Sequence, residues 1–175
     1  MTGELSRRFE TLPGVVGIVG SRAADPDRGR MTGWPLEGYK LILNLVGRIV
    51  DVRRGWGETA HIVTGDAPSG VDFQVRLACR NLSLCSTEHI QMDPLSVDCL
   101  NDHYTVFPAY WHGRDGKGKL NRLAGFERNE RLVRHCGLLI ALFGPDATPG
   151  TQDAINRARE WDVPVLVYQN GRWHE

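Results

Sequence analysis

The sequence predicts an α/β fold: a single Rossmann-like domain over residues 1–175, with a mostly parallel sheet and helices on both faces. Short apolar runs alternate with stretches of helical periodicity along most of the chain. The runs "GVVGIVG" and "GLLIALF" lack polar alternation, which is typical of strands buried on both faces. A length of 175 residues fits one domain with a proper hydrophobic core.

The first half of the chain gives two strands and two helices. A strand is expected in "GVVGIVGSR", and a long helix in "PLEGYKLILNLVGRIVDVRR". That helix places apolar side chains on one face, namely those of Leu41, Ile42, Leu45, Val46, Ile49 and Val50. A second strand is expected at residues 61–64, followed by a helix over about 71–82. Residues 83–103 resist assignment and are expected to form an irregular excursion over one edge of the sheet, in which "LSVDCLNDH" could be a short helix.

The second half continues the alternation. "YTVFPAYW" is expected to be a strand ending in an aromatic loop, and the glycine-rich residues 111–122 a mobile loop. "AGFERNERLVRHC" predicts a helix, "GLLIALF" a strand, "GTQDAINRAREW" a helix and "VPVLVY" the last strand. Thr148 followed by Pro149 suits a helix N-cap and first turn.

The composition limits the classes of partner that the protein is expected to bind. The 21 basic and 21 acidic residues cancel, so a nucleic-acid partner is not expected. All the basic residues except Lys40, Lys117 and Lys119 are arginines, which suit bidentate contacts to phosphate or carboxylate. There is no apolar run of about 18 residues and no apolar N-terminal segment typical of secretion, so no membrane contact and a cytoplasmic location are expected.

Neither a metal site nor a disulfide framework is expected. The four cysteines show no CxxC spacing, and the six histidines form no HExxH or HxH pair. In a reducing compartment such cysteines are typically small buried hydrophobic residues.

Three segments rich in small residues follow predicted strands. They are Gly20-Ser21-Arg22, "GDAPSGVD" from Gly65 to Asp72, and "FGPDATPGTQDAI". In parallel α/β sheets ligands bind beyond the carboxyl ends of the strands, and helix N-termini there present N–H groups to anions. Each segment alone is more typical of plain turn chemistry. Since all three are expected at the same edge, they predict one anion-binding site; neither GxGxxG after the first strand nor a P-loop is present.

The motifs together resemble the SLOG superfamily. The residues that carry the resemblance are "GIVGSR", "IVTGDAPSGVD", "FPAYW", "AGFERNERLV", "LLIALF" and "PGTQDAINRA". They are most similar to the small DUF2493/YspA-like branch, which is related to the LOG-type lysine-decarboxylase-like proteins and to DprA. The resemblance implies a bacterial or phage Rossmann-like protein that binds a nucleotide or nucleotide-derived ligand, among which an NAD- or ADP-ribose-derived signal is a candidate. It also implies pairing into a homodimer or higher homo-oligomer, to which the apolar helix at residues 39–50 could contribute.

Carried over to this sequence, the resemblance implies a set of ligand-binding residues around one cleft: Gly20, Ser21, Arg22, Gly65, Ser69, Gly70, Asp72, Arg128, Asn129, Gly150 and Thr151. Trp111 is a further candidate, because its ring could stack on a base, and a core or lid role for it stays open. Arg22 and Arg128 could supply charge, and the glycines could supply backbone donors. Simpler roles stay open. Arg128 could pair with Glu127 or Glu130, and Asp72 could cap its helix.

The resemblance favours a binder over an enzyme, as a sensor or sequestering module without an intrinsic cofactor. LOG proteins hydrolyse the N-glycosidic bond of nucleoside monophosphates and carry a glutamate in PGGxGTxxE; its position here is Ala154, with Asp153 one residue early. Glycosidic cleavage needs a carboxylate near the ribose, and Asp72 is the leading candidate, before Asp66 and Glu127. A second alternative is DprA-like binding of single-stranded DNA, on a face formed by Arg7, Arg8, Arg53 and Arg54.

Overall fold

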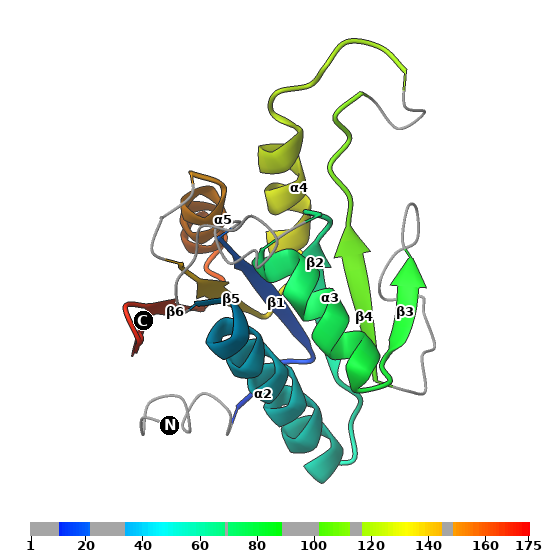
Figure 1. The fold of residues 1–175 in the computed structure, drawn as a ribbon, viewed down its shortest axis with the longest axis vertical. Helices are drawn as coiled ribbons and strands as arrows, with labels where there is room; N and C mark the ends of the chain where they lie inside the picture. Colours follow the sequence, from blue (N-terminus) through cyan, green and yellow to red (C-terminus); the bar gives the residue numbers. More distant parts are fainter. Residues whose placement is uncertain (1–10, 22–33, 69, 89–101, 113–116, 145–148) are drawn as a thin grey trace.

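A computed structural model describes residues 11–21, 34–68, 70–88, 102–112, 117–144 and 149–175. These residues form seven strands in one sheet and four helices, shown in Figure 1. The strands are β1 (Val15–Gly20), β2 (His61–Gly65), β3 (Cys85–Glu88), β4 (His103–Phe107), β5 (Leu138–Leu142), β6 (Val165–Gln169) and β7 (Arg172–His174). The helices are α2 (Trp34–Gly55), α3 (Val71–Asn81), α4 (Ala124–Val133) and α5 (Pro149–Glu160).

The sheet order is β3-β4-β2-β1-β5-β6-β7, and all neighbouring strands are parallel except the antiparallel pair β6 and β7. From β1 the chain moves outward through β2, and then returns through α4 to place β5 on the other side of β1. The strand order therefore reverses between β1 and β5, and such a reversal opens a crevice at the carboxyl ends of the two strands. This confirms the predicted α/β fold with a mostly parallel, Rossmann-like sheet.

Two apolar cores cover the two faces of the sheet. Alternate residues of β1 point to opposite faces, as strand geometry requires. Val16 and Ile18 pack with α2 and α3 in one core, whereas Val19 packs with Leu132 of α4 and Ile155 of α5 in the other. Because both faces are covered, β2 and β5 are buried along their whole length, which explains the continuous apolar sequence of β5. Leu45, Val46 and Ile49 belong to the first core, so the apolar face of α2 covers the sheet.

Two strands differ from what the sequence predicts. The excursion expected at residues 83–103 is wrong in part, because β3 lies within it and pairs in parallel with β4; residues 89–101 lie outside the described part of the chain. As an edge strand with Cys85 and Ser86 exposed, β3 carries no apolar pattern to reveal it. The other unexpected strand, β7, returns from β6 through a tight turn at Asn170-Gly171.

The remaining boundaries shift by one to three residues, and the largest shift is in α4, which ends at Val133 and not at Cys136. The strand expected at 61–64 extends to Gly65, and α3 ends at Asn81 rather than at residue 82. Helix α5 begins at Pro149, as a proline in a first turn predicts, whereas Thr148 lies outside the described residues, as do residues 113–116 of the loop expected at 111–122. Within the described ranges, no helix combines the length and apolarity needed to cross a bilayer.

Candidate functional site

A cavity of about 320 Å³ lies at the reversal in strand order. It is bounded by the carboxyl end of β1, the segment after β2, the loop before α4, α4 itself and the first turn of α5. Its lining residues are Val19, Gly20, Ala67, Asp72, Trp111, Arg122, Gly125, Phe126, Arg128, Asn129, Pro149, Gly150 and Thr151. This is the position at which parallel α/β sheets bind ligands.

Gly20 fixes the floor of the cavity. A Cβ at this position would lie 2.3 Å from the Leu142 carbonyl oxygen and 2.5 Å from Val71 Cγ2, so only glycine lets α3 approach the end of β1. The next residue, Ser21, is buried and ties both neighbours through its backbone. Its N–H donates to the Leu142 carbonyl at 3.0 Å, and its carbonyl accepts the Val71 N–H at 3.2 Å.

The start of α3 requires glycine for a different reason. Gly70 has φ 78° and ψ −151°, a backbone conformation that residues with a side chain hardly adopt. This conformation turns the chain from the loop after β2 into α3. Gly70 shapes this wall but does not line the cavity, and Ser69 before it lies outside the described residues.

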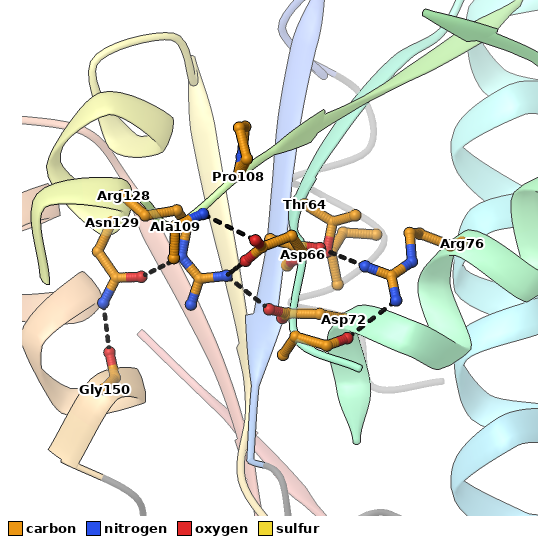
Figure 2. Close-up of polar contacts among 12 residues, drawn as sticks. Thr64, Asp66, Asp72, Arg76, Pro108, Ala109, Arg128, Asn129 and Gly150 are labelled. Carbon is orange, nitrogen blue, oxygen red and sulfur yellow. Dashed lines mark hydrogen bonds and ion pairs between the residues drawn. The ribbon is translucent and has the colours of Figure 1, made fainter. Parts of the chain in front are cut away.

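Arg128 of α4 is held by two carboxylates from the opposite wall, as Figure 2 shows. Its Nη1 lies 2.9 Å from Asp72 Oδ2 and 3.4 Å from Asp66 Oδ1. Gly65 makes room for this pairing, because a Cβ there would lie 1.7 Å from Arg128 Nη1. The alternative that Arg128 pairs with Glu127 or Glu130 is wrong, since its partners come from the segment after β2.

Asp72 is the carboxylate that lines the cavity. It is 4% exposed, and its carboxylate accepts hydrogen bonds from Arg128 and from the Ala67 N–H. Burial raises the pKa of Asp72, and the positive charge of Arg128 opposes that rise. The alternative that Asp72 caps its helix is not observed, because Gly70 is the N-cap residue and no side chain caps α3.

Arg76 and Asp66 complete a balanced set of charges on this wall. Arg76 donates to the carbonyl oxygens of Gly65 at 3.1 Å and Ala67 at 2.9 Å, which fixes the loop between β2 and α3. Asp66 accepts the Ala109 N–H at 2.7 Å, which ties the loop after β4 to the same wall. Two arginines thus face two carboxylates, so Arg128 brings little net positive charge to the cavity.

Asn129 connects α4 to α5. Its side-chain N–H groups donate to the Gly150 carbonyl at 2.8 Å and to Asp153 Oδ2 at 3.0 Å, and its Oδ1 accepts from Arg128 Nε at 3.0 Å. Together, Arg128 and Asn129 hold both walls of the cavity to one helix. The first turn of α5 then faces the cavity with the positive end of its helix dipole.

The residue at the position of the LOG-type glutamate is Ala154, and it belongs to the apolar core. Ala154 is fully buried in the apolar core between α5 and the sheet. Asp153 lies beside it on α5, where its carboxylate is bound by Asn129 and by Arg157 at 3.0 Å. Neither residue is among those that line the cavity.

The open side of the cavity is formed by residues with few ties to the rest of the fold. Trp111 is 39% exposed, and Arg122 is exposed with no ion-pair partner among the residues that the structure describes. Phe126 of α4 adds a second aromatic ring. Arg122 and Phe126 were not among the residues expected from the sequence, although Phe126 lies within the "AGFERN" motif and Arg122 lies two residues before it.

The structure brings together many of the residues expected at the site. Those that line the cavity are Gly20, Asp72, Trp111, Arg128, Asn129, Gly150 and Thr151. Three more, Ser21, Gly65 and Gly70, lie behind its walls as described above. Arg22 and Ser69 lie outside the described residues. Gly150 borders open space, since a Cβ added there would have no atom within 4 Å.

No cluster of three or more histidine, cysteine, aspartate or glutamate side chains with metal-binding geometry occurs in the described ranges. Cys79 and Cys136 are buried free thiols, and burial raises the pKa of Cys79 to about 12. Such thiols are unreactive at neutral pH, because the thiolate is the nucleophilic form. Cys99 lies outside the described residues.

Comparison with known proteins identifies a likeness of fold. Neither the known protein-family models nor the curated proteins gave a match. Among solved structures, the chain is similar to the X-ray structure of DNA processing protein A (DprA) from Streptococcus pneumoniae, with a TM-score of 0.50 and 19% sequence identity. The alignment covers 91% of this chain and 51% of that one, so this chain spans about half of its length. The likeness supports the α/β Rossmann-like fold that the sequence predicted, and it distinguishes neither a superfamily nor the DUF2493/YspA-like branch.

Proposed function

We propose that the cavity binds a nucleotide or nucleotide-derived ligand, and that the chain serves as a sensor or sequestering module. The observation that carries this proposal is the convergence of the motif residues on one cavity at the reversal in strand order, beside a helix N-terminus. Anions bind well at such N-termini, and aromatic rings at the open side suit a base. An NAD- or ADP-ribose-derived signal is one ligand of this class.

The charges suggest how such a ligand would lie. Because Arg128 is neutralised by Asp66 and Asp72, a phosphate is expected nearer to Arg122 and the first turn of α5. The base would then lie toward Trp111. A volume of about 320 Å³ is near the lower end of the roughly 300–1,000 Å³ of small-molecule sites, which favours a group of mononucleotide size.

A thermal-shift screen tests the proposal. AMP, ADP, ADP-ribose, its cyclic isomers, NAD and cyclic dinucleotides would be compared, and a ligand at 100 times its Kd should stabilise the fold by about 2.7 kcal/mol. Arg122→Ala should then weaken the hit by about 10- to 100-fold, since a charged hydrogen bond contributes about 1.5–3 kcal/mol. Arg159→Ala is the matched control, because Arg159 is exposed on α5 away from the cavity. No shift with any nucleotide, or equal losses in both variants, would refute the proposal.

Hydrolysis of the ligand is the enzymatic alternative, and we favour binding without turnover. The LOG-type glutamate position is filled by the buried Ala154, and Asp72 is committed to Arg128. Incubation of each hit followed by HPLC should recover the ligand intact. Released free base that disappears in Asp72→Asn would instead identify the protein as an N-glycosidic hydrolase with Asp72 as its carboxylate.

A nucleic-acid-related role is the second candidate function. The fold likeness to a protein named for DNA processing favours this role. The expectation of no nucleic-acid partner rested on the zero net charge, and the fold likeness does not support that expectation. The arginine face expected for it is weakly suited, because Arg53 is tied to Leu12, Glu58 and Thr59, and Arg54 to Asp102. Arg7 and Arg8 lie outside the described residues. Salt-dependent binding of a labelled single strand is the discriminating measurement.

Self-association and a cytoplasmic location remain part of the proposal. The burial of the apolar face of α2 within the first core removes the surface first considered for pairing. Phe73 and Leu77 of α3, which are 41% and 37% exposed, are the better candidates. Light scattering coupled to gel filtration should give a dimer or larger species, and a monomer at micromolar concentration would contradict this part.

A further inference from the structure

A second open groove lies on the other side of α4 from the nucleotide cavity. Its volume is about 650 Å³, and we call it the lysine groove; its lining residues are Tyr110, Lys117, Lys119, Asn121, Glu127, Glu130 and Arg131. It runs between α4 and the described parts of the chain before it, residues 108–112 and 117–123, which rise beyond the sheet in Figure 1. Two of the three lysines of the whole chain line it, and both are exposed.

The carboxylates of the lysine groove are already engaged. Glu130 pairs with Arg134 at 2.6 Å and with Arg157 at 2.9 Å, and Glu127 accepts a hydrogen bond from Asn121 at 2.9 Å. The lining itself carries three cations, on Lys117, Lys119 and Arg131, against the two carboxylates of Glu127 and Glu130. The groove therefore carries a net positive charge in a chain whose total charge is zero.

An aromatic and guanidinium stack forms one wall of the lysine groove. The Arg131 guanidinium carbon lies 4.8 Å from the centre of the Tyr110 ring, and Arg131 also donates to the Pro108 carbonyl oxygen, which fixes its position. Planar groups of this kind are the surfaces on which unpaired nucleic-acid bases stack. A groove that combines such a stack with cations offers contacts to both bases and phosphates.

We propose that the lysine groove binds single-stranded nucleic acid, with phosphates along Lys117 and Lys119 and a base against the Tyr110–Arg131 stack. A duplex keeps its bases stacked on each other and cannot use the aromatic wall. The inference rests on the second candidate function above and not on the nucleotide cavity, whose residues lie on the opposite side of α4.

Fluorescence anisotropy with a labelled oligothymidylate of about 16 nucleotides, near the upper site size of a single binding fold, tests the proposal. Binding should weaken as salt rises. The double variant Lys117→Gln/Lys119→Gln should bind more weakly and lower the slope of log K against log salt by about 1.4, or 0.7 for each lost phosphate contact. The matched control is Lys40→Gln/Arg159→Gln, which removes the same charge from exposed positions on α2 and α5. It should keep the wild-type slope.

Three outcomes would overturn the proposal: no salt-dependent binding by the wild type, equal losses in the two double variants, or equally tight binding of duplex DNA or polyphosphate. Both double variants change exposed side chains, so circular dichroism should show an unchanged fold. The thermal shift by a mononucleotide should be the same in Lys117→Gln/Lys119→Gln and in the wild type. Failure of the nucleotide cavity and failure of the lysine groove are thus separate results.

Discussion

Replacing Gly65 by alanine is the sharpest test of how the nucleotide cavity is built. The new Cβ would lie 1.7 Å from Arg128 Nη1 and 2.2 Å from Asp72 Oδ2, so the guanidinium and the carboxylate would have to move out of their present contact. The side chains of Arg128 and Asp72 are only 12% and 5% exposed, so water cannot replace the lost partner. Breaking a buried pair of this kind costs about 3–5 kcal/mol. We expect Gly65→Ala to lose about that much stability.

Urea unfolding followed by circular dichroism measures this loss. Gly150→Ala is the matched control, because a Cβ there meets nothing within 4 Å and the residue lies in a helical first turn. It should leave stability unchanged or raise it by up to about 1 kcal/mol, since alanine favours helix over glycine.

A double-mutant cycle then identifies the cause. With Arg128→Ala already present, the atom closest to the new Cβ is gone, so Gly65→Ala should cost at least about 1 kcal/mol less than in the wild type. A loss below about 1 kcal/mol in the wild-type background would refute the reasoning. The same cost in both backgrounds would show that Arg128 is not the group displaced.

Three further changes address other parts of the fold. Burial lowers the pKa of His61 to about 4, and His103 and His135 add to the effect. As pH falls below about 6.5, only the unfolded state binds a proton at this residue, so the free energy of unfolding should drop by about 2 kcal/mol between pH 7 and pH 5. Urea titrations of His61→Gln should show a smaller drop. Ala154→Glu would bury a carboxylate in the core beside α5 and should cost several kcal/mol or raise the pKa of the new group, whereas the exposed Gln152→Glu should be neutral in thermal melts. Asp102→Ala leaves the buried Ala60 N–H unpaired and should cost about 1–3 kcal/mol, against little change for the exposed Asp51→Ala in the same assay.

The strands with apolar sequences were predictable, both the fully buried β5 and the partly buried β6. The apolar runs at β1, β2 and β5 reflect cores on each side of the sheet, so their composition alone reveals them. β3 could not be found in this way, because its edge position leaves Cys85 and Ser86 in solvent. β7 did leave a signal. Asn170-Gly171, with φ angles of 53° and 76°, is the dipeptide that a two-residue hairpin turn prefers.

The location of the site was predictable, but the state of its charges was not. Small residues after parallel strands indicate the same edge of the sheet, so Gly20, Gly150 and the "AGFERN" residues were expected to converge. The partners of Arg128 are 56 and 62 residues away in sequence, and they bind its guanidinium in place of the neighbouring Glu127 and Glu130. Only the folded arrangement of β2, α3 and α4 shows that this arginine is already neutralised.

The contacts that α4 makes through Arg128 and Asn129 determine which positions of the site could be substituted without disturbing the cavity. Arg128 and Asn129 each bind a different wall, so a substitution at either disturbs the loop after β2 or the start of α5. Trp111 and Arg122 lie on the rim without such ties, and both line the same cavity. A lineage or a designer could therefore exchange these two side chains to select a new ligand, while the tethered residues preserve the shape of the cavity.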